Sequence, residues 1–402
     1  MRLLHTADWH FGRTLEGRSR QAEHEAFVDE LARIADEADV DAVLLAGDVY
    51  DSVNPPADAE TLFYEALTRL SNGGRRPVVA IAGNHDHPDR LSAAGPLARA
   101  QGVALVGLPT LDVVRLTIPR TGERANVYAL PYPSESRLKE LLSAEADEQA
   151  LQLAYSARIA ALVRDATGDM FGKGSVDVVM SHLHALGGSP TDSERPIEVG
   201  GAYTVDPSAF GRAAQYVALG HLHRPQDVRV RDDGENGAAG AAPRIRYSGS
   251  PLAFSFSEAG QAKSVSIVDL APGGTPRVEE VPLSAGRPLV RWIAKEGLAD
   301  VHRWFDEGRD ARAWIDLELH VTDALTMEQI QTLRRSHEGL VLIRPVFASA
   351  PESLSVRAER ALPIDELFRR FYARQTGGAT PDEATVRLFL ELVQEEAEEE
   401  SA

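Results

Sequence analysis

The chain has 402 residues, which is enough for two or three domains with a sizeable core. Its 42 basic and 61 acidic residues give a formal net charge of -19, which argues against a surface that binds polyanions through general positive charge. Cysteine is absent, and this excludes both disulfides and thiolate metal sites.

The first residues enter a predicted strand directly, without the pattern of a signal peptide, and no apolar run is long enough to span a membrane. We therefore expect a cytoplasmic protein that has no membrane partner.

The first part of the chain alternates predicted strands and helices. Apolar runs at residues 2–7, 42–46 and 77–82 are typical of buried parallel strands. Between them, residues 20–38 and 57–70 have the apolar spacing of helices. This repetition predicts a mostly parallel sheet covered by helices, and hence an α/β fold.

The middle of the chain adds one long helical stretch and four strands. The helical stretch is 135–166, and the strands are 176–180, 216–219, 244–247 and 264–270. The segment 231–243 is rich in Gly, Asp and Ala and lacks an apolar pattern, so it predicts a mobile surface loop.

From residue 288 the pattern restarts as a small α+β unit. Its predicted strands are 290–294, 314–321 and 340–346, and its predicted helices are 299–305 and 327–336. We predict three parts of the chain, with boundaries at 1–283, 284–350 and 351–402.

The last part carries two helices with apolar stripes. The stripe of the first helix consists of Ile364, Leu367, Phe368, Phe371 and Tyr372, and that of the second of Val386, Phe389, Leu390 and Val393. The second helix opens with a Thr-x-x-Glu capping box formed by Thr380 and Glu383.

Side chains that can hold metal ions follow five of the predicted strands. They are Asp8, His10, Asp48, Asn84, His85, His182, His221 and His223. Ligands gather at the carboxyl ends of strands in open α/β sheets. A lone His is more often a core or surface residue, but five such pieces in this order favour a functional site. Nitrogen and oxygen ligands suit Mn²⁺, Fe²⁺ or Zn²⁺.

In these residues the sequence resembles a known family. Asp8-x-His10, Gly47-Asp48, Gly83-Asn84-His85-Asp86, His182 and Gly220-His221-x-His223 are similar to the motifs of the calcineurin-like metallophosphoesterases. Within them, the chain resembles the SbcD family, the nuclease subunits of bacterial SbcCD repair complexes, over nearly its full length. The closer resemblance lies in residues 5–10, 47–51, 218–224 and 247–251.

The resemblance implies a metallophosphoesterase sheet core flanked by helices, then a small α+β capping domain and a C-terminal helical hairpin. It also implies two divalent metal ions, with manganese as the expected metal. One ion would be held by Asp8, His10, Asp48 and His223, and the other by Asp48, Asn84, His182 and His221. Asp48 would bridge them, because a carboxylate has an oxygen for each ion. Two such metal ions would attract a phosphate group despite the net negative charge of the chain.

We expect His85 to be catalytic and not a ligand, because Asn84 beside it already supplies one. Asp86 could orient His85 or support the turn, and the sequence leaves both roles open. We expect structural or surface roles for His5, His87 and His184. Phosphate contacts are possible for four arginines, although surface solvation is the expected role of any one of them: Arg13, Arg18, Arg20 and Arg90.

The resemblance implies a hydrolase with exonuclease and endonuclease activity on DNA ends and hairpins. It also implies a role in DNA repair, recombination and replication. Its implied partners are DNA and an SbcC-type ATPase, whose coiled-coil base would receive the C-terminal helices, with a homodimer inside a heterotetramer. Two other interpretations stay open: a phosphatase or small-nucleotide phosphodiesterase, and a non-catalytic scaffold with a relic site. The small domain and helix pair count against the first, and the intact ligand set counts against the second.

Overall fold

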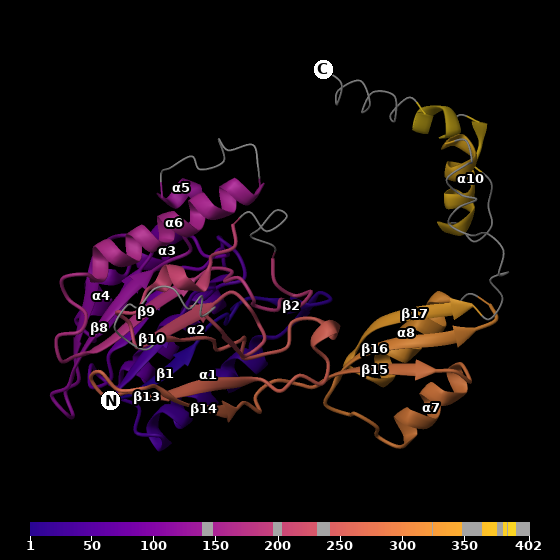
Figure 1. Ribbon diagram of the computed structural model, residues 1–402. Helices are drawn as coiled ribbons and strands as arrows, with labels where there is room; N and C mark the ends of the chain where they lie inside the picture. Colours follow the sequence, from indigo (N-terminus) through magenta and orange to yellow (C-terminus); the bar gives the residue numbers. More distant parts are fainter. Residues whose placement is uncertain are drawn as a thin grey trace. The chain divides into compact units, whose positions relative to one another are not determined.

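The computed structural model describes residues 1–138, 148–195, 203–230, 242–323, 325–347, 364–375, 381–383 and 385–390. The chain divides into two compact units (Figure 1). The first consists of Met1–Arg291 and Arg312–Ile315, and the second of Trp292–Ala311 and Asp316–Ala402. Most of the loop predicted at 231–243 lies outside the described residues. No helix of the described residues combines the length and apolar composition needed to cross a membrane.

Within the described residues, two six-stranded sheets form the core of the first unit. The first sheet has the order β14-β13-β1-β4-β5-β6, with β1 (Arg2–Thr6), β4 (Ala42–Leu45), β5 (Val78–Ile81), β6 (Val103–Val106), β13 (Ser264–Asp269) and β14 (Arg277–Pro282). The strands β1, β4, β5 and β6 are parallel. β13 pairs antiparallel with β1, and β14 closes that edge.

The second sheet has the order β11-β12-β10-β9-β8-β7. Its strands are β7 (Val113–Thr117), β8 (Arg124–Leu130), β9 (Val176–His182), β10 (Tyr216–Gly220), β11 (Gln226–Val228) and β12 (Arg244–Tyr247). The four central strands are parallel, and the two edge strands are antiparallel to their neighbours.

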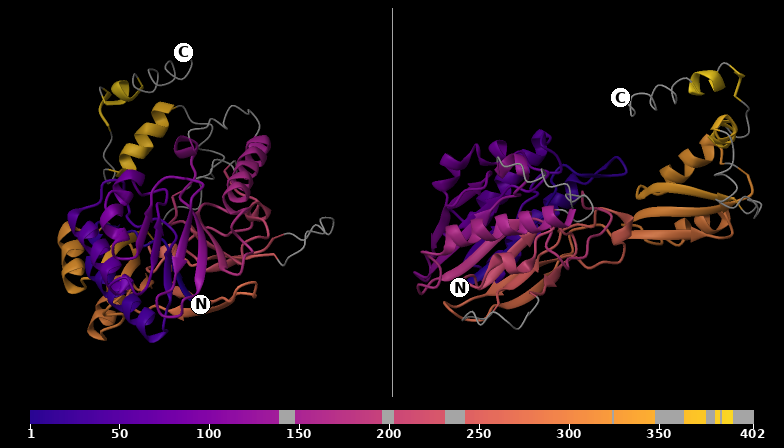
Figure 2. Two further views of the ribbon diagram at one scale, coloured as in Figure 1. Left: turned by 90° about the vertical axis from the view of Figure 1, so that its left-hand side faces the viewer. Right: turned by 45° about the horizontal axis from the view of Figure 1, so that its top comes forward.

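The helices cover the outer faces of the sheets. α1 (Gln21–Glu37) and α2 (Ala57–Ser71) pack on the first sheet, and α6 (Glu148–Thr167) packs on the second. In the left view of Figure 2, the indigo and purple helices lie on one side of the strands and the magenta α6 on the other. The described part of this unit is therefore layered helix, sheet, sheet, helix.

Shorter elements connect these layers. They are β2 (Thr14–Leu15), β3 (Arg18–Ser19), α3 (Pro88–Ser92), α4 (Gly95–Arg99), α5 (Glu135–Leu138) and the 3-10 turns η1 (Pro207–Phe210) and η2 (Phe256–Glu258). The helical stretch predicted at 135–166 corresponds to α5 and α6, and the residues between them lie outside the described chain.

The central strands are apolar on both faces because both faces are covered. In β4, Val43 and Leu45 face α1 and α2, whereas Ala42 and Leu44 face the second sheet. Successive side chains of a strand point to opposite faces, so a strand buried on both sides needs a continuous apolar run. This run is the signal from which the strands were predicted.

The sequence predicted one mostly parallel sheet, whereas the structure has two. The parallel strands β1, β4, β5 and β6 confirm the prediction for the first part of the chain. The later strands pair with one another, since β8 lies beside β9 and β7. A continuous apolar run shows that both faces of a strand are covered, but it cannot tell a covering helix from a covering sheet.

In the second unit, a three-stranded sheet carries two helices. The elements are β15 (Leu289–Ala294), α7 (Leu298–Asp306), β16 (Trp314–Val321), α8 (Met327–Ser336) and β17 (Leu340–Phe347). The ring of Trp292 in β15 lies 5.1 Å from that of Trp304 in α7 and 6.0 Å from that of His337 after α8. Both helices therefore pack on the face of the sheet that carries Trp292.

The C-terminal helices pack on each other through aromatic rings. α10 (Ile364–Gln375) places Phe368 in a stack with Phe389, with 4.2 Å between ring centroids and 9° between ring planes. Val386 is buried, whereas the ring of Phe371 is 57% exposed. The predicted stripe is thus split between an internal contact and an exposed surface.

The start of the second C-terminal helix is capped by an aspartate. Asp382 Oδ1 accepts a hydrogen bond of 2.7 Å from the Thr385 N–H, as an N-cap does. The cap predicted at Thr380 lies outside the described residues.

Candidate metal centre and active site

Both sheets deliver candidate ligands to one end of the first unit. Asp8 follows β1, Asp48 follows β4 and Asn84 comes shortly after β5, all in the first sheet. His182 ends β9 of the second sheet, and its Nδ1 lies 2.9 Å from the carbonyl oxygen of Ala46 at the end of β4. The carboxyl ends of the parallel strands therefore meet across the two sheets.

Several candidate ligands have backbone conformations that L residues rarely adopt. The φ angles are positive at Asp8 (56°), His10 (47°), Asp48 (50°) and His221 (105°). Each such residue costs about 1–3 kcal/mol and persists only where the surrounding structure imposes it, often at functional sites.

Two glycines allow the strand ends to approach so closely. A Cβ at Gly83 would lie 2.0 Å from Asp48 Oδ1. A Cβ at Gly47 would lie 2.4 Å from His182 Nδ1, and the φ of Gly47 is +91°. Any side chain at either position would displace a candidate ligand.

A first group of ligand atoms is formed by Asp8, His10 and His223, which lie within 4.8 Å of one another. His10 Nε2 is 3.1 Å from His223 Nε2 and 3.6 Å from Asp48 Oδ2. All four side chains are buried, so the nitrogen and oxygen atoms face one another and not bulk water.

A second group is formed by Asp8, Asp48 and His182, also within 4.8 Å of one another. His182 Nε2 is 2.8 Å from Asn84 Oδ1 and 3.5 Å from Asp48 Oδ1. His221 lies beside this group, with its ring centroid 5.5 Å from that of His182. Its backbone N–H donates to Asp8 Oδ1 at 2.9 Å.

The carboxylates of this centre influence each other. Burial raises the pKa of Asp8 well above its usual range, and the charge of Asp48 adds to this effect. Burial also opposes the ionisation of Asp48, but protonated His182, His85 and His10 outweigh burial at the low pH where Asp48 titrates, so the pKa of Asp48 is lowered. A cation between the two carboxylates would stabilise the charged form of both.

Burial lowers the pKa of the four candidate imidazole ligands, which are His10, His182, His221 and His223. These rings are therefore neutral near pH 7, the state in which histidine binds metals. The short His–Asp contacts accordingly join a neutral ring to a carboxylate and are not ion pairs.

The donor set fits divalent metal ions. If Nδ1–H of His182 donates to the Ala46 carbonyl, its Nε2 lone pair points toward Asn84 Oδ1 at 2.8 Å. The Nε2 atoms of His10 and His223 likewise face each other at 3.1 Å. Lone pairs this close repel each other unless a proton or a cation lies between them, and imidazole with carboxylate ligands suits Mn²⁺, Fe²⁺ or Zn²⁺.

His85 is held differently from the candidate ligands. Its Nδ1 lies 2.7 Å from the Asp51 carbonyl oxygen, so Nδ1–H donates there and Nε2 is left toward the site. Its Nε2 is 4.0 Å from Asp48 Oδ2. With His10 and Asp51, His85 forms a third group of candidate ligand atoms within 4.8 Å of one another, and its ring centroid lies 4.8 Å from that of His10. His85 thus lies at the edge of the centre, beside His10 of the first group.

Asp86 supports the turn that carries Asn84 and His85. Its carboxylate accepts hydrogen bonds from the backbone N–H groups of Gly83, Val49 and Tyr50 at 2.8, 3.1 and 2.9 Å. Burial, followed by the charge of Asp48, raises the pKa of Asp86 to about 6. Of the two roles that the sequence left open, these contacts favour support of the turn.

Three other histidines lie outside these groups of ligand atoms. His5 lies between the sheets, with Nδ1 2.9 Å from the Tyr216 hydroxyl and Nε2 3.2 Å from the Leu219 carbonyl oxygen. His87 is exposed and caps α3. His184 has its ring centroid 6.0 Å from that of His221, and its Nε2 is 3.5 Å from the Gly188 carbonyl oxygen.

Of the four arginines for which phosphate contacts are possible, Arg20 lies 5.9 Å from the centroid of the Phe254 ring, and Arg13 comes closer to the centre. Its guanidinium lies 4.7 Å from the ring centroid of Phe254 and 3.6 Å from Asp51 Oδ1. Arg20 is buried in a bidentate pair with Glu23. Arg90 pairs with Glu60 at 3.1 Å; Arg18 is exposed in β3.

Sequence reasoning missed a group of residues that surround His10 and His223. Asp51 Oδ1 lies 3.4 Å from His10 Nδ1, and Ser193 Oγ lies 2.6 Å from His223 Nδ1. Lys263 donates to the His223 carbonyl oxygen at 3.1 Å. Asp51 belongs to the strand-end segment 47–51, which offered a signal, whereas nothing in the local sequence marks Ser193 or Lys263.

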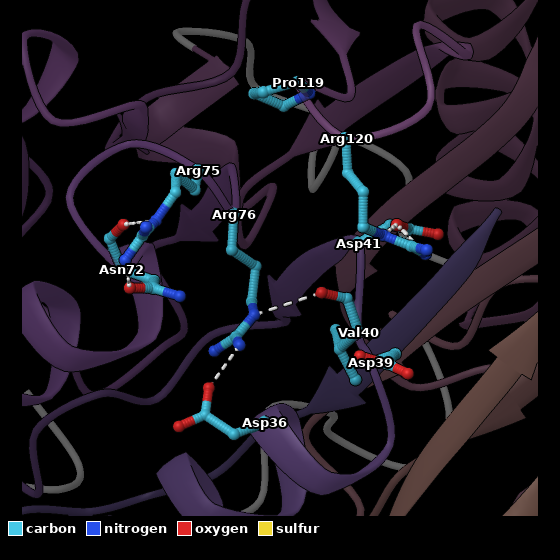
Figure 3. A pocket seen from close by; sticks show the side chains of 9 residues that line it. All are labelled: Asp36, Asp39, Val40, Asp41, Asn72, Arg75, Arg76, Pro119 and Arg120. Carbon is cyan, nitrogen blue, oxygen red and sulfur yellow. Dashed lines mark hydrogen bonds and ion pairs between the residues drawn. The ribbon is translucent and has the colours of Figure 1, made fainter.

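A cavity of about 520 Å³ lies at the opposite ends of β4 and β5 (Figure 3). It is lined by Asp36, Asp39, Val40, Asp41, Asn72, Arg75, Arg76, Pro119 and Arg120. Arg76 reaches Asp36 and the Val40 carbonyl oxygen, and Arg120 pairs with Asp41. The three arginines are thus held by acceptors of the chain itself, which indicates a structural role.

A family model for calcineurin-like phosphoesterases matches residues 1–225, more than half of the chain. That span includes all three groups of candidate ligand atoms, His85 among them. The chain therefore belongs to the calcineurin-like phosphoesterase family, which consists of hydrolases, as its motifs predicted.

Within this family the chain is similar to the SbcD subunits of SbcCD nucleases. It is 51% identical to that of Bacillus subtilis (strain 168) over 401 residues, covering 100% of both chains. Identity is 40% over 309 residues with that of Rhodobacter capsulatus, covering 73% of this chain and 72% of the other. It is 28% over 407 residues with that of Escherichia coli K12, covering 97% of both. The predicted resemblance to the SbcD nuclease subunits is thereby confirmed.

Proposed function

We propose that this protein is the metal-dependent DNA nuclease subunit of an SbcCD-type repair complex. In this proposal it hydrolyses phosphodiester bonds with two divalent metal ions, and Mn²⁺ is the preferred metal. The convergence of Asp8, His10, Asp48, His182 and His223 at one end of the two sheets carries the proposal. The full-length similarity to SbcD subunits supports the choice of DNA over a small phosphoester as substrate.

The proposed ligands form two sets that share Asp48. One set is Asp8, His10, Asp48 and His223, and the other is Asp48, Asn84, His182 and His221. When bound, two divalent ions act as Lewis acids, lower the pKa of a water molecule and stabilise the leaving oxygen of a phosphodiester. The chain contributes neutral imidazoles and two carboxylates, held in place by the positive-φ turns after the strands.

His85 is proposed to act on the substrate and not on the ions. Its Nδ1–H is committed to the Asp51 carbonyl oxygen, so Nε2 is the atom that can protonate the leaving oxygen or stabilise charge on the phosphate. Arg13, whose side chain is 18% exposed and lies 3.6 Å from Asp51 Oδ1, is proposed to contact the phosphate backbone.

The second unit is proposed to serve the partners. The boundaries 1–283, 284–350 and 351–402 stay a prediction for the nuclease, capping and partner-binding parts. In the last part, the exposed ring of Phe371 would dock on the coiled-coil base of an SbcC-type ATPase. The proposed partners are DNA and that ATPase. The proposed assembly is a homodimer within a heterotetramer, and the proposed location is the cytoplasm.

The proposal is tested by cleavage assays on the purified chain, with and without the partner ATPase. Radiolabelled duplex and hairpin DNA are compared with a small chromogenic phosphodiester in Mn²⁺, and Asp48→Asn is the inactive control. We expect metal-dependent DNA cleavage that the ATPase increases. Efficient hydrolysis of the small ester with no DNA cleavage in the complex would establish the phosphodiesterase alternative instead.

A further inference from the structure

One residue of the centre, His223, is hydrogen-bonded to the loop that carries Ser193 and Glu194. Ser193 Oγ lies 2.6 Å from His223 Nδ1, and the His223 N–H donates to Glu194 Oε1 at 2.8 Å. Ser193 and His223 are both buried. Arg13 fixes the loop from outside by donating to the Ser193 carbonyl oxygen at 3.0 Å.

The other neighbours of His223 hold its backbone or its ring face. Lys263 donates to its carbonyl oxygen, and the Phe254 ring lies 5.5 Å away between centroids. Glu258 Oε1 is 4.0 Å from Nδ1, which is beyond hydrogen-bond distance. Ser193 is therefore the hydrogen-bond partner of the Nδ1 atom.

The hydroxyl of Ser193 belongs to a chain of hydrogen bonds that ends on a carboxylate. Ser193 Oγ lies 2.9 Å from Thr191 Oγ1, and Thr191 Oγ1 donates to Glu194 Oε2 at 2.6 Å. A carboxylate can only accept, and each hydroxyl has a single proton to donate. With the Thr191 proton on Glu194, the 2.9 Å contact between the two hydroxyls is a hydrogen bond only if Ser193 donates to Thr191, and Ser193 Oγ then accepts from His223 Nδ1–H.

This direction decides the tautomer of His223. A neutral imidazole has one N–H, so a proton on Nδ1 leaves the lone pair on Nε2. Nε2 is the atom that lies 3.1 Å from His10 Nε2 and faces the proposed ion. Hydrogen-bond partners of this kind fix the orientation and tautomer of metal-ligating histidines.

We propose that the relay Glu194–Thr191–Ser193 is a positioning device that sets the tautomer of His223 for metal binding. The inference rests on the proposed function, because it needs His223 to be a ligand. The hydrogen bonds of the Thr191 side chain go to Ser193 and Glu194 and reach His223 only through them, so an effect of Thr191 on metal affinity would distinguish the relay from direct packing on His223.

Mn²⁺ binding to the metal-free full chain, followed by titration calorimetry, tests the relay. We expect Ser193→Ala and Thr191→Val each to weaken one of two Mn²⁺ equilibria about 10–100-fold, the usual effect of losing such a partner. Ser193→Thr keeps the hydroxyl and should recover most of the affinity. Ser189→Ala removes an exposed hydroxyl from the same stretch and should bind Mn²⁺ as the parent does.

Thermal unfolding of the metal-free variants reports folding separately, and the midpoints should match that of the parent. Parent-like Mn²⁺ affinity of Thr191→Val would overturn the relay, as would equal losses in Ser193→Ala and Ser193→Thr. His223→Ala separates this failure from that of the proposed function. If His223→Ala loses one ion while Ser193→Ala binds normally, the centre stands and the relay is wrong. If His223→Ala keeps both ions, the proposed ligand set fails and the relay fails with it.

Discussion

His85 differs from the neighbouring histidines, which are candidate metal ligands, in its exposure and its hydrogen bonding. The side chain of His85 is 12% exposed, whereas those of His10, His182 and His223 are at most 1% exposed. Its Nδ1 is occupied by a backbone carbonyl group, as a residue oriented toward substrate requires. The neighbouring Asn84, in contrast, points its oxygen at His182 within the ligand group.

This difference predicts distinct outcomes for two matched substitutions. His85→Gln should keep both metal ions and DNA binding but lower the cleavage rate about 10²–10⁴-fold, the usual contribution of a general acid or base. His221→Gln should lose metal and activity together. Metal content by elemental analysis and single-turnover cleavage rates are measured side by side. Loss of metal from His85→Gln, or near-normal cleavage by it, would contradict the catalytic role.

A second residue-scale feature is the buried His24 in α1. Neither of its ring nitrogens has a hydrogen-bond partner among the described residues, and its ring packs 5.3 Å from that of Phe11. Burial lowers the pKa of His24 to about 3. The unfolded chain takes up this proton near pH 6.5 while the folded chain does not, so stability falls as the pH drops below that value.

His24→Leu should remove this acid sensitivity. One unit of pKa difference corresponds to about 1.4 kcal/mol, so the parent should lose about 2 kcal/mol more than His24→Leu between pH 7 and pH 5. The free energy of unfolding in urea, measured on metal-free protein at both pH values, checks this difference. The exposed His302 provides the control His302→Gln, which should behave as the parent does. Equal losses in parent and His24→Leu would refute the assignment.

At the scale of elements, the centre depends on how closely strand ends approach. The turn after β5 passes Asp48 so tightly that a Cβ on Gly83 would lie 2.0 Å from its Oδ1. Gly83→Ala should therefore destabilise the fold by about 1–3 kcal/mol and lower Mn²⁺ affinity, because Asp48 must move. Gly95→Ala is the control, since its Cβ would meet nothing within 4 Å. Unchanged melting temperature and metal content in Gly83→Ala would show that the turn adapts.

The first C-terminal helix, α10, carries both a packed and an exposed aromatic residue. Phe368 stacks on Phe389 inside the pair, while Phe371 is exposed. Phe371→Glu should abolish binding to the coiled coil of the partner ATPase without lowering helix content. Phe368→Ala should lower the stability of the pair by about 1 kcal/mol, since an aromatic stack contributes that much beyond its buried area. Calorimetric binding and circular dichroism measure the two effects, and retained binding in Phe371→Glu would refute docking through this ring.

The elements that position the centre could be predicted because their signals are local. A continuous apolar run followed by glycine and a polar residue marks the end of a buried parallel strand, as at Gly47 and Asp48. The strand-end residues Asp8, Asn84 and His182 were found in this way, and the structure brings them together.

Other features could not be predicted because they depend on contacts between distant segments. The second sheet arises from strand pairing, which an apolar run does not encode. Ser193 and Lys263 reach His223 only after the loops have folded over the strand ends. The role of Asp86 needed its three backbone hydrogen bonds to become visible.

At the scale of the molecule, the first unit has its candidate metal site and a structural arginine cluster at opposite ends of the same strands. The candidate metal centre lies at the carboxyl ends of β4 and β5, and the arginine cavity of Figure 3 lies at their amino ends. Arg76 there is buried and donates to the carbonyl oxygens of Val40 and Leu70 and to Asp36. It thereby joins the ends of α1 and α2 to the start of β5.

Arg76→Leu should lower the free energy of unfolding by about 2–4 kcal/mol, because two buried carbonyl groups lose a charged donor. Mn²⁺ affinity below the melting temperature should stay unchanged. Arg75→Leu, at an exposed neighbour that bonds only within its own turn to Asn72, should change stability by less than about 0.5 kcal/mol. Urea unfolding and Mn²⁺ titration test both statements, and a loss of metal affinity in Arg76→Leu would show that the two ends are coupled.

The antiparallel pairing of β1 with β13 has a consequence for biosynthesis. A ribosome releases β1 first, yet one of its two neighbours, Ser264–Asp269, emerges only after all the proposed ligands have left the tunnel. Pairing across so long a stretch of chain is entropically costly and slow. The nascent polypeptide therefore holds its complete ligand set while one edge of β1 is still open, and a fragment that ended at residue 225 would keep that edge open permanently. The first sheet is therefore completed only after every strand that carries a proposed ligand has been synthesised.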